Sequence, residues 1–210
     1  MRQSMFYGVG VALLALSSTA HAATIRFDTD PFAGTTALTT PGRQIIANEL
    51  FTTFNIATDV FSLESTIFGT GPDVHFVNAT APNVPATGVN VVVLQTFDDD
   101  NNPLTNFAAG NAANLIAAQI TTPGPGFFIY FNQGLDVARL VFSTDLNDNQ
   151  ADLKVLARMT NLSGQIGRDA IPTFTAQNFQ FTTVPEPASL SLMAVAGLVG
   201  AGRRYLRRGR

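Results

Sequence analysis

Residues 127–142 read FFIYF-NQGLD-VARLVF, which is two apolar runs joined by five turn-forming residues. The runs Phe127–Phe131 and Val137–Phe142 are rich in aromatic and β-branched side chains, which favour strands. A connection of five residues, Asn132–Asp136, lies within the common range for a link between antiparallel neighbours. This segment predicts a β-hairpin and is the clearest element of the chain.

Short strands are predicted on both sides of this hairpin, separated by turn signals rich in Gly, Pro, Asn and Asp. The stretch from Gly88 to Phe97 is almost continuously apolar, which is typical of a strand buried at the centre of a sheet. Residues 43–55 are ambiguous, because their apolar residues recur at helical spacing while Thr52 and Thr53 favour a strand; we prefer a turn followed by a strand. The other predicted strands are Thr24–Phe27, Val60–Ser65, Asp73–Val77, Asp152–Met159 and Phe179–Phe181.

One helix is predicted, from Phe107 to Ile120, because this segment is rich in alanine and ends before Pro123-Gly124-Pro125-Gly126. Short strands with one short helix predict an all-β fold, an antiparallel β-sandwich of jelly-roll-like form. Sixteen of the seventeen phenylalanines lie in residues 23–183, and we expect them to build its core.

The charge of this middle region excludes one class of partner. Residues 23–183 contain six basic and fourteen acidic side chains, a formal net charge of −8. A surface of this sign repels phosphate backbones, so we expect no nucleic acid partner. The chain has no cysteine, so disulfides cannot stabilise it and packing must do so.

The first 22 residues have the three parts of a secretory signal peptide. Arg2 gives a positive start, Val9–Leu16 gives the apolar segment, and Ala20-His21-Ala22 is a small-x-small cleavage site. We expect the signal peptidase to cut between Ala22 and Ala23, which exports the residues that follow. The alternative is an uncleaved N-terminal membrane helix.

The last 27 residues form a second targeting segment. Val184-Pro185-Glu186-Pro187 precedes an uncharged apolar run, residues 188–202, and the chain closes with an arginine cluster. As a helix the run would span roughly 22 Å, short of a hydrocarbon core of about 30 Å, but Tyr205, Leu206 and snorkelling arginines would close most of the gap. We therefore predict a transmembrane helix whose arginine end stays in the cytoplasm. The alternative is a buried helix of a soluble core.

This tail resembles the PEP-CTERM sorting signal of Gram-negative bacteria. The resemblance rests on Pro185, Glu186 and Pro187, on the apolar run, and on Arg203, Arg204, Arg207 and Arg208. It implies recognition by exosortase, a membrane-embedded protease-transpeptidase that removes such tails, and a link to exopolysaccharide and biofilm. It covers about an eighth of the chain and says nothing of the chemistry of residues 23–183.

The expected organisation therefore has three parts: a signal peptide (1–22), an exported β-rich domain (23–183) and the sorting signal (184–210). The precursor would be anchored in the inner membrane, with its acidic domain outside the cytoplasm. The mature protein would then reach the cell surface or the medium.

Two acidic stretches raise the question of calcium, which prefers several oxygen ligands. Asp145–Asp152 places oxygens at positions one, three and five of a calcium loop, but Gln150 replaces the usual glycine and Leu156 the usual glutamate. Asp98-Asp99-Asp100 offers three adjacent carboxylates. Both stretches are also typical of solvated turns, so we predict no metal and no cofactor, with calcium as the alternative.

Few residues of the exported domain point to catalysis. His75 is its single histidine and belongs to no motif, and there is no Gly-x-Ser-x-Gly sequence. Glu49, Glu64 and many aspartates are present, but their spacing selects no pair for glycoside hydrolysis.

The sequence thus favours a non-enzymatic surface or extracellular-matrix protein. The alternatives are a carbohydrate-binding module that recognises exopolysaccharide and, less favoured, a hydrolase. The carbohydrate-binding hypothesis expects exposed Trp or Tyr, whereas the exported domain has no Trp and only Tyr130.

Overall fold

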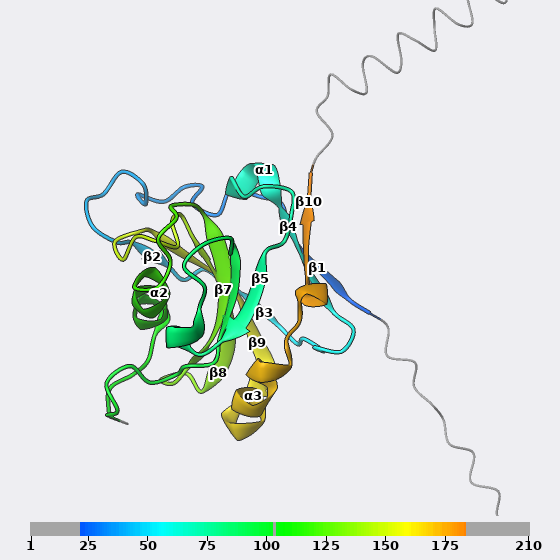
Figure 1. The fold of residues 1–210 in the computed structure, drawn as a ribbon. Coiled ribbons are helices and arrows are strands. Elements are labelled where there is room, and N and C mark those ends of the chain that lie inside the picture. Colours follow the sequence, from blue (N-terminus) through cyan, green and yellow to red (C-terminus); the bar gives the residue numbers. More distant parts are fainter. Residues whose placement is uncertain (1–21, 103, 184–210) are drawn as a thin grey trace, which may run out of the picture.

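The hairpin predicted from residues 127–142 lies in the middle of the larger of two sheets (Figure 1). The computed structural model describes residues 22–102 and 104–183 of the chain. Strands β7 (Gly126–Asn132) and β8 (Val137–Ser143) pair antiparallel along their full length. Asp136 adopts a left-handed φ of 52° where the chain turns into β8. The predicted hairpin is confirmed.

The larger sheet has seven strands, in the order β2-β9-β8-β7-β6-β5, and β3 also pairs with β9. β9 (Leu153–Ser163) continues the antiparallel pattern beside β8. β6 (Val91–Leu94) and β5 (Phe76–Ala79) follow β7 in parallel at one edge. At the other edge β2 (Ile45–Ile46) and β3 (Leu50–Thr52) run parallel to β9. The ambiguous residues 43–55 thus contain the expected strand, β3, preceded by a second short strand.

A smaller sheet is made of β1 (Thr24–Phe27), β4 (Val60–Glu64) and β10 (Phe179–Thr182), in the order β1-β4-β10. Both outer strands run parallel to β4. Figure 1 shows this sheet on one side of the larger sheet, with helix α2 (Ala109–Ala117) on the other side. The three strands confirm predicted ones, but the sequence did not indicate that they form a sheet of their own.

Strand direction is where the prediction of an antiparallel sandwich is wrong. Of the eight strand pairings in the described residues, six are parallel, and only β7–β8 and β8–β9 are antiparallel. Long connections, such as residues 80–90 between β5 and β6, let the chain cross over and return in the same direction. The fold is β-rich as predicted, with mixed strand direction.

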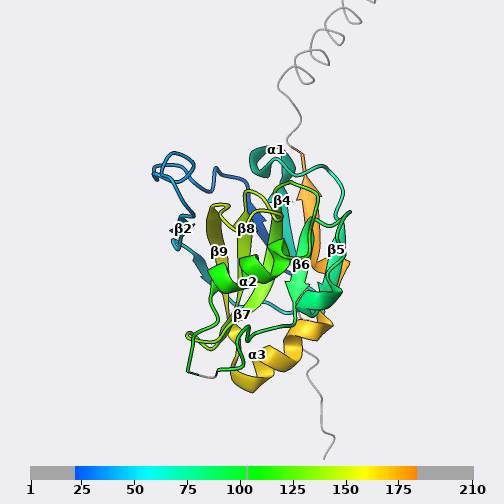
Figure 2. The ribbon, with the colours of Figure 1, turned by 60° about the vertical axis from the view of Figure 1, so that its left-hand side comes forward.

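The central strands of the larger sheet, β6, β7 and β8, are buried on both faces. On one face Phe127 and Ile129 pack with Phe61 of the smaller sheet, and on the other Phe128 packs with Ile116 of α2. Figure 2 shows α2 lying across this second face. Alternate residues of β7 enter different cores, so all seven are buried. This explains why the hairpin sequence is apolar without alternation.

Phenylalanine rings join the two sheets. The ring centroids of Phe127 in β7 and Phe181 in β10 are 5.7 Å apart, and those of Phe76 in β5 and Phe179 in β10 are also 5.7 Å apart. Phe61 in β4 also stacks on Phe54, with centroids 4.2 Å apart. The predicted role of the phenylalanines in the core is confirmed for most of them, while Phe51 and Phe97 are exposed. The buried ones are Phe32, Phe54, Phe61, Phe68, Phe107, Phe127, Phe128, Phe131, Phe142, Phe174 and Phe179.

Three α-helices, rather than the one predicted, occur in the described residues. α2 lies inside the predicted range and confirms it. α1 (Ser65–Phe68) is a single turn, and α3 (Gly164–Ala170) follows β9. α3 contains two glycines, so its composition gives a weak helix signal. The remaining short helices are the 3₁₀ turns η1 (Ala81–Asn83), η2 (Ile171–Thr173) and η3 (Ala176–Asn178).

Within residues 22–102 and 104–183, no helix combines the length and the apolar character that a membrane crossing requires. The helices predicted in the signal peptide and in the sorting tail fall on residues that are not described.

Removing the ring of Phe61 tests the junction between the sheets. Phe61 is fully buried, so Phe61→Ala should lower the free energy of unfolding by about 3–5 kcal/mol, measured by urea denaturation of the exported protein. Phe51 is 61% exposed, and its main contact is the guanidinium of Arg158, so Phe51→Ala should cost about 1 kcal/mol or less. Equal losses in the two variants would contradict this core assignment.

Candidate functional site

The strand that leads to the sorting tail is described, although the tail is not. β10 ends at Thr182, three residues before Pro185. The sorting signal therefore begins directly after a strand of the smaller sheet. The predicted processing residues outside the described part are Ala20, Pro185, Glu186, Pro187, Arg203, Arg204, Arg207 and Arg208.

The other predicted processing point lies at the start of the same sheet. Ala22 and Ala23, which flank the expected signal-peptidase cut, are exposed, and β1 begins at the next residue. Thr24 lies beside Val60 at the start of β4, and Thr182 lies beside Glu64 at its end. The two processing points thus belong to the two outer strands of one sheet, at opposite ends.

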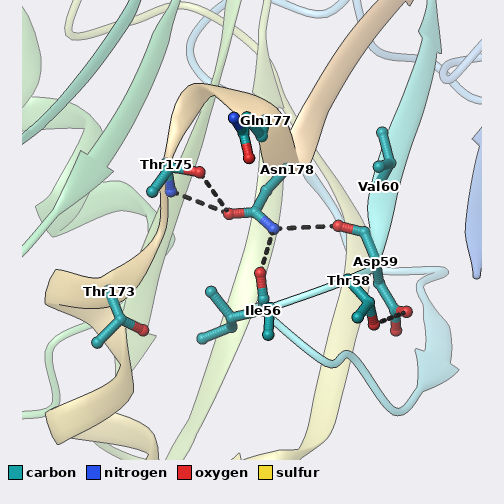
Figure 3. Close-up of a pocket in the computed structure, with 9 residues that line it drawn as sticks. Ile56, Thr58, Asp59, Val60, Thr173, Thr175, Gln177 and Asn178 are labelled. Carbon is teal, nitrogen blue, oxygen red and sulfur yellow. Dashed lines mark hydrogen bonds between the residues drawn. The ribbon is translucent and has the colours of Figure 1, made fainter. Parts of the chain in front are cut away.

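A cleft of about 490 Å³ opens between the loop before β4 and the turns before β10 (Figure 3). Asn178 is buried beside it and joins its two walls. The side-chain amide donates to the carbonyl oxygens of Ile56 at 2.7 Å and Asp59 at 3.0 Å, and its oxygen accepts from the N–H of Thr175 at 2.9 Å. The cleft is lined by Ile56, Ala57, Thr58, Asp59, Val60, Thr173, Thr175, Gln177 and Asn178.

Asp59 is the one carboxylate of this lining, and it is 6% exposed. One oxygen accepts the N–H of Ala23 at 2.9 Å and the hydroxyl of Thr58 at 3.1 Å, and the other accepts the N–H of Asn55 at 2.8 Å. Burial by itself raises the pKa of Asp59, but these hydrogen bonds outweigh it and lower the pKa below its ordinary value. The charged carboxylate is therefore a structural acceptor at the edge of the cleft.

The lowered pKa of Asp59 predicts a pH dependence. The carboxylate stabilises the fold above its unfolded pKa of about 3.9, and this contribution is lost as pH falls through the lower folded value. Asp59→Asn should lower the free energy of unfolding by about 1–3 kcal/mol at pH 7 and should flatten its decline below about pH 4. Urea denaturation from pH 2 to 7 measures both, with the exposed Asp73→Asn as the matched control. An unchanged acid profile in Asp59→Asn would refute this role.

The acidic stretch 98–100 gathers its carboxylates. In the described part of the chain, Asp98, Asp99 and Asp100 each place a carboxylate oxygen within 4.8 Å of the other two. Asp98 accepts the N–H of Asn101 at 2.8 Å, Asp99 accepts the amide of Asn111 at 2.8 Å, and Asp100 accepts the hydroxyl of Thr105. The hydrogen bond from Thr105 is the main cause of the lowered pKa of Asp100. These bonds order the loop from within, and calcium binding here stays the untested alternative to a solvated loop.

The second acidic stretch uses its carboxylates to fasten separate loops. Asp145 accepts the N–H groups of Gly124 at 3.0 Å and Asn147 at 2.9 Å. Asp152 is 8% exposed and accepts the N–H groups of Leu38 and Gln44, each at 2.6 Å. Asp145, the first ligand that the sequence suggested, therefore already holds backbone groups of two segments, as Asp152 at the end of the stretch does.

The titratable residues considered for catalysis lie apart from one another. His75 is exposed and lines a cleft of about 240 Å³ whose lining includes no carboxylate. Glu64 is buried and accepts the hydroxyls of Thr66 at 3.0 Å and Thr182 at 3.1 Å. Glu49 is held by arginines. The structure thus does not bring His75 together with either glutamate.

Glu49 forms a buried charge cluster that sequence reasoning missed. Its two oxygens accept Nε of Arg139 at 2.8 Å and Nη2 of Arg158 at 2.5 Å, and the Glu49 side chain is only 4% exposed. Arg139 and Arg158 lie opposite each other on β8 and β9, so an anion between them is required. Arg139 also donates to the hydroxyl of Tyr130.

Lys154, near the start of β9, also binds the segment that contains Glu49. Its Nζ donates to the carbonyl oxygen of Asn48 at 2.8 Å. Burial lowers the pKa of Lys154, and the negative charge of Glu49 opposes this shift. The signal in the sequence was the presence of basic residues inside apolar strand runs, which implies a buried acidic partner.

Removing the charge of Glu49 should be costly. Glu49→Gln leaves two arginines without their carboxylate and should lower the free energy of unfolding by about 3–5 kcal/mol. The matched control is Asp136→Asn, which breaks a pair with Arg168 at 3.2 Å whose carboxylate is 56% exposed, so about 1 kcal/mol or less is expected. Urea denaturation compares the two, and a loss from Glu49→Gln no larger than the control would contradict the cluster's role.

The aromatic residues do not form the platform that a carbohydrate-binding module would use. Tyr130 is fully buried, where burial raises its pKa, and its hydroxyl accepts the amide of Asn132 at 2.9 Å. The two exposed rings lie far apart in the strand order, since Phe51 is in β3 and Phe97 follows β6. The described residues therefore offer no row of exposed aromatic rings.

Comparison with known proteins gives one match. A family model of the PEP-CTERM protein-sorting motif matches residues 183–208, a range that contains every sorting residue predicted in the tail. No curated protein and no solved structure matches the chain. The match therefore concerns how the protein is sorted and does not extend to the β-rich domain.

Proposed function

Because the chain carries a PEP-CTERM sorting motif at residues 183–208, we propose that it is a non-enzymatic surface or extracellular-matrix protein of a Gram-negative bacterium. Its tail anchors the precursor in the inner membrane, and exosortase removes the tail. The released β-rich domain then serves in the cell envelope or in the exopolysaccharide matrix of a biofilm. The sorting motif is the single observation that carries this proposal.

The position of the motif supports handling by a membrane-embedded enzyme. Two residues, Thr183 and Val184, separate the end of β10 from Pro185, so the three steps from Thr182 to Pro185 span at most about 11 Å. An enzyme that reads Pro185–Pro187 at the membrane surface would therefore work close to the smaller sheet. The domain would be presented folded, with Pro185–Pro187 as the recognised segment.

The non-enzymatic part of the proposal is supported by what the polar side chains already do. Asp59, Glu49 and Asp152 are buried acceptors that hold backbone groups or arginines in place. Such residues stabilise a domain that has no disulfide. A net charge of −8 on residues 23–183 keeps the domain soluble and disfavours its contact with other polyanions.

Processing by exosortase is tested on the full-length chain. In a host with exosortase, mass spectrometry should find a mature C-terminus near Pro185–Pro187 and the domain outside the inner membrane. In the same host without exosortase, or with Glu186→Ala, full-length protein should accumulate in the membrane fraction. Ser189→Ala, in the apolar run, is the control and should be processed normally. The same C-terminus in both hosts would refute the proposal.

A further inference from the structure

The nitrogen of Ala23 has an unusual partner for a backbone group at the edge of a sheet. It lies 2.9 Å from a carboxylate oxygen of Asp59, which is 6% exposed. The carbonyl of Ala23 accepts the N–H of Val60 at 2.9 Å, so both sides of Ala23 are fixed to the start of β4. Ala22 and Ala23 are themselves exposed residues.

Cleavage after Ala22 would change the chemistry of this nitrogen. An amide N–H carries one hydrogen and no charge, whereas the new terminus carries three hydrogens and a positive charge at neutral pH. The carboxylate that already accepts the amide would then face an ammonium at hydrogen-bond distance. A charge-assisted hydrogen bond of this kind is about twice as strong as a neutral one.

We infer that Asp59 is the acceptor for the ammonium group of a mature N-terminus at Ala23. The inference rests on the predicted signal-peptidase site and goes beyond the sorting function of the tail. Its evidence is the coincidence of two independent observations: the small-x-small motif ends at Ala22, and the next nitrogen meets the buried carboxylate beside the cleft.

The ion pair reaches the strand that leads to the tail. The carbonyl oxygen of Asp59 accepts the amide of Asn178 at 3.0 Å, and β10 starts at the next residue, Phe179. Ala23, Asp59 and Asn178 directly precede β1, β4 and β10, and they form one chain of contacts at the start of the three strands. Removal of the signal peptide would add an ion pair to this end of the sheet whose strand β10 leads to the sorting signal.

The test exploits the difference between an amide and an ammonium. Full-length protein is exported with its own signal peptide, or with Gly-Ser inserted between Ala22 and Ala23, and N-terminal mass analysis establishes the first residue. The insertion keeps the amide hydrogen bond to Asp59 but moves the charge away. Each form is also made with Asp59→Asn, and urea denaturation gives the unfolding equilibrium constant of all four exported proteins.

We expect the native protein to start at Ala23. Asp59→Asn should raise its unfolding constant at least about fivefold more than it raises that of the inserted form, which is the scale of a partly buried ion pair. Equal effects in the two forms, or a native N-terminus at any other residue, would overturn the inference.

A second measurement needs no variant of Asp59, so it does not depend on whether the Asp59→Asn protein folds. Acylation requires the neutral amine, and pairing with Asp59 should raise the pKa of the Ala23 amine. The reaction at neutral pH should therefore slow by about tenfold for each unit by which that pKa rises. The native and inserted proteins are compared at neutral pH, folded and in urea. Slower acylation confined to the folded native protein supports the ion pair, and equal rates for the two folded proteins contradict it.

Discussion

Burial of β7 and β8 on both faces is the constraint on which the rest of the arrangement depends. A sheet that is apolar on both sides needs two covering layers, and here the smaller sheet covers one face and α2 the other. Basic residues within such strands must then find an anion inside the protein. Glu49 meets this need for Arg139 and Arg158 and thereby fixes the segment that contains β2 and β3 at the edge of β9.

Features that depend on residues adjacent in the sequence were predictable from it. The hairpin, β1, β6 and α2 each have a contiguous pattern, and each is confirmed within a few residues. Strand direction was not predictable, because it depends on where long connections cross, and a loop such as residues 80–90 carries no sign of its route. α3 was missed because two glycines weaken its helix signal, while packing of Gly167 against the backbone at Leu162 holds it in place.

The candidate sites divide in the same way. The sorting motif is contiguous, so it was recognisable from its residues, and the family match agrees. The cleft was not recognisable from the sequence, because its walls come from residues 56–60 and 173–178. These two segments are more than a hundred residues apart in the chain. Asp59 looks like one loop aspartate among many in the sequence, and only the fold brings it to Ala23 and Asn178.

The parallel pairing of β10 with β4 has a mechanical consequence for any pull applied to the C-terminal end of the domain. Tension along the direction of β10 acts in shear, so it loads the hydrogen bonds between the two strands together instead of opening them one by one. At the first residue of β10, the buried ring of Phe179 packs against Phe61 and Phe76 and adds apolar contacts that resist such tension. The smaller sheet is thus the part of the domain that would carry tension applied at its C-terminal end.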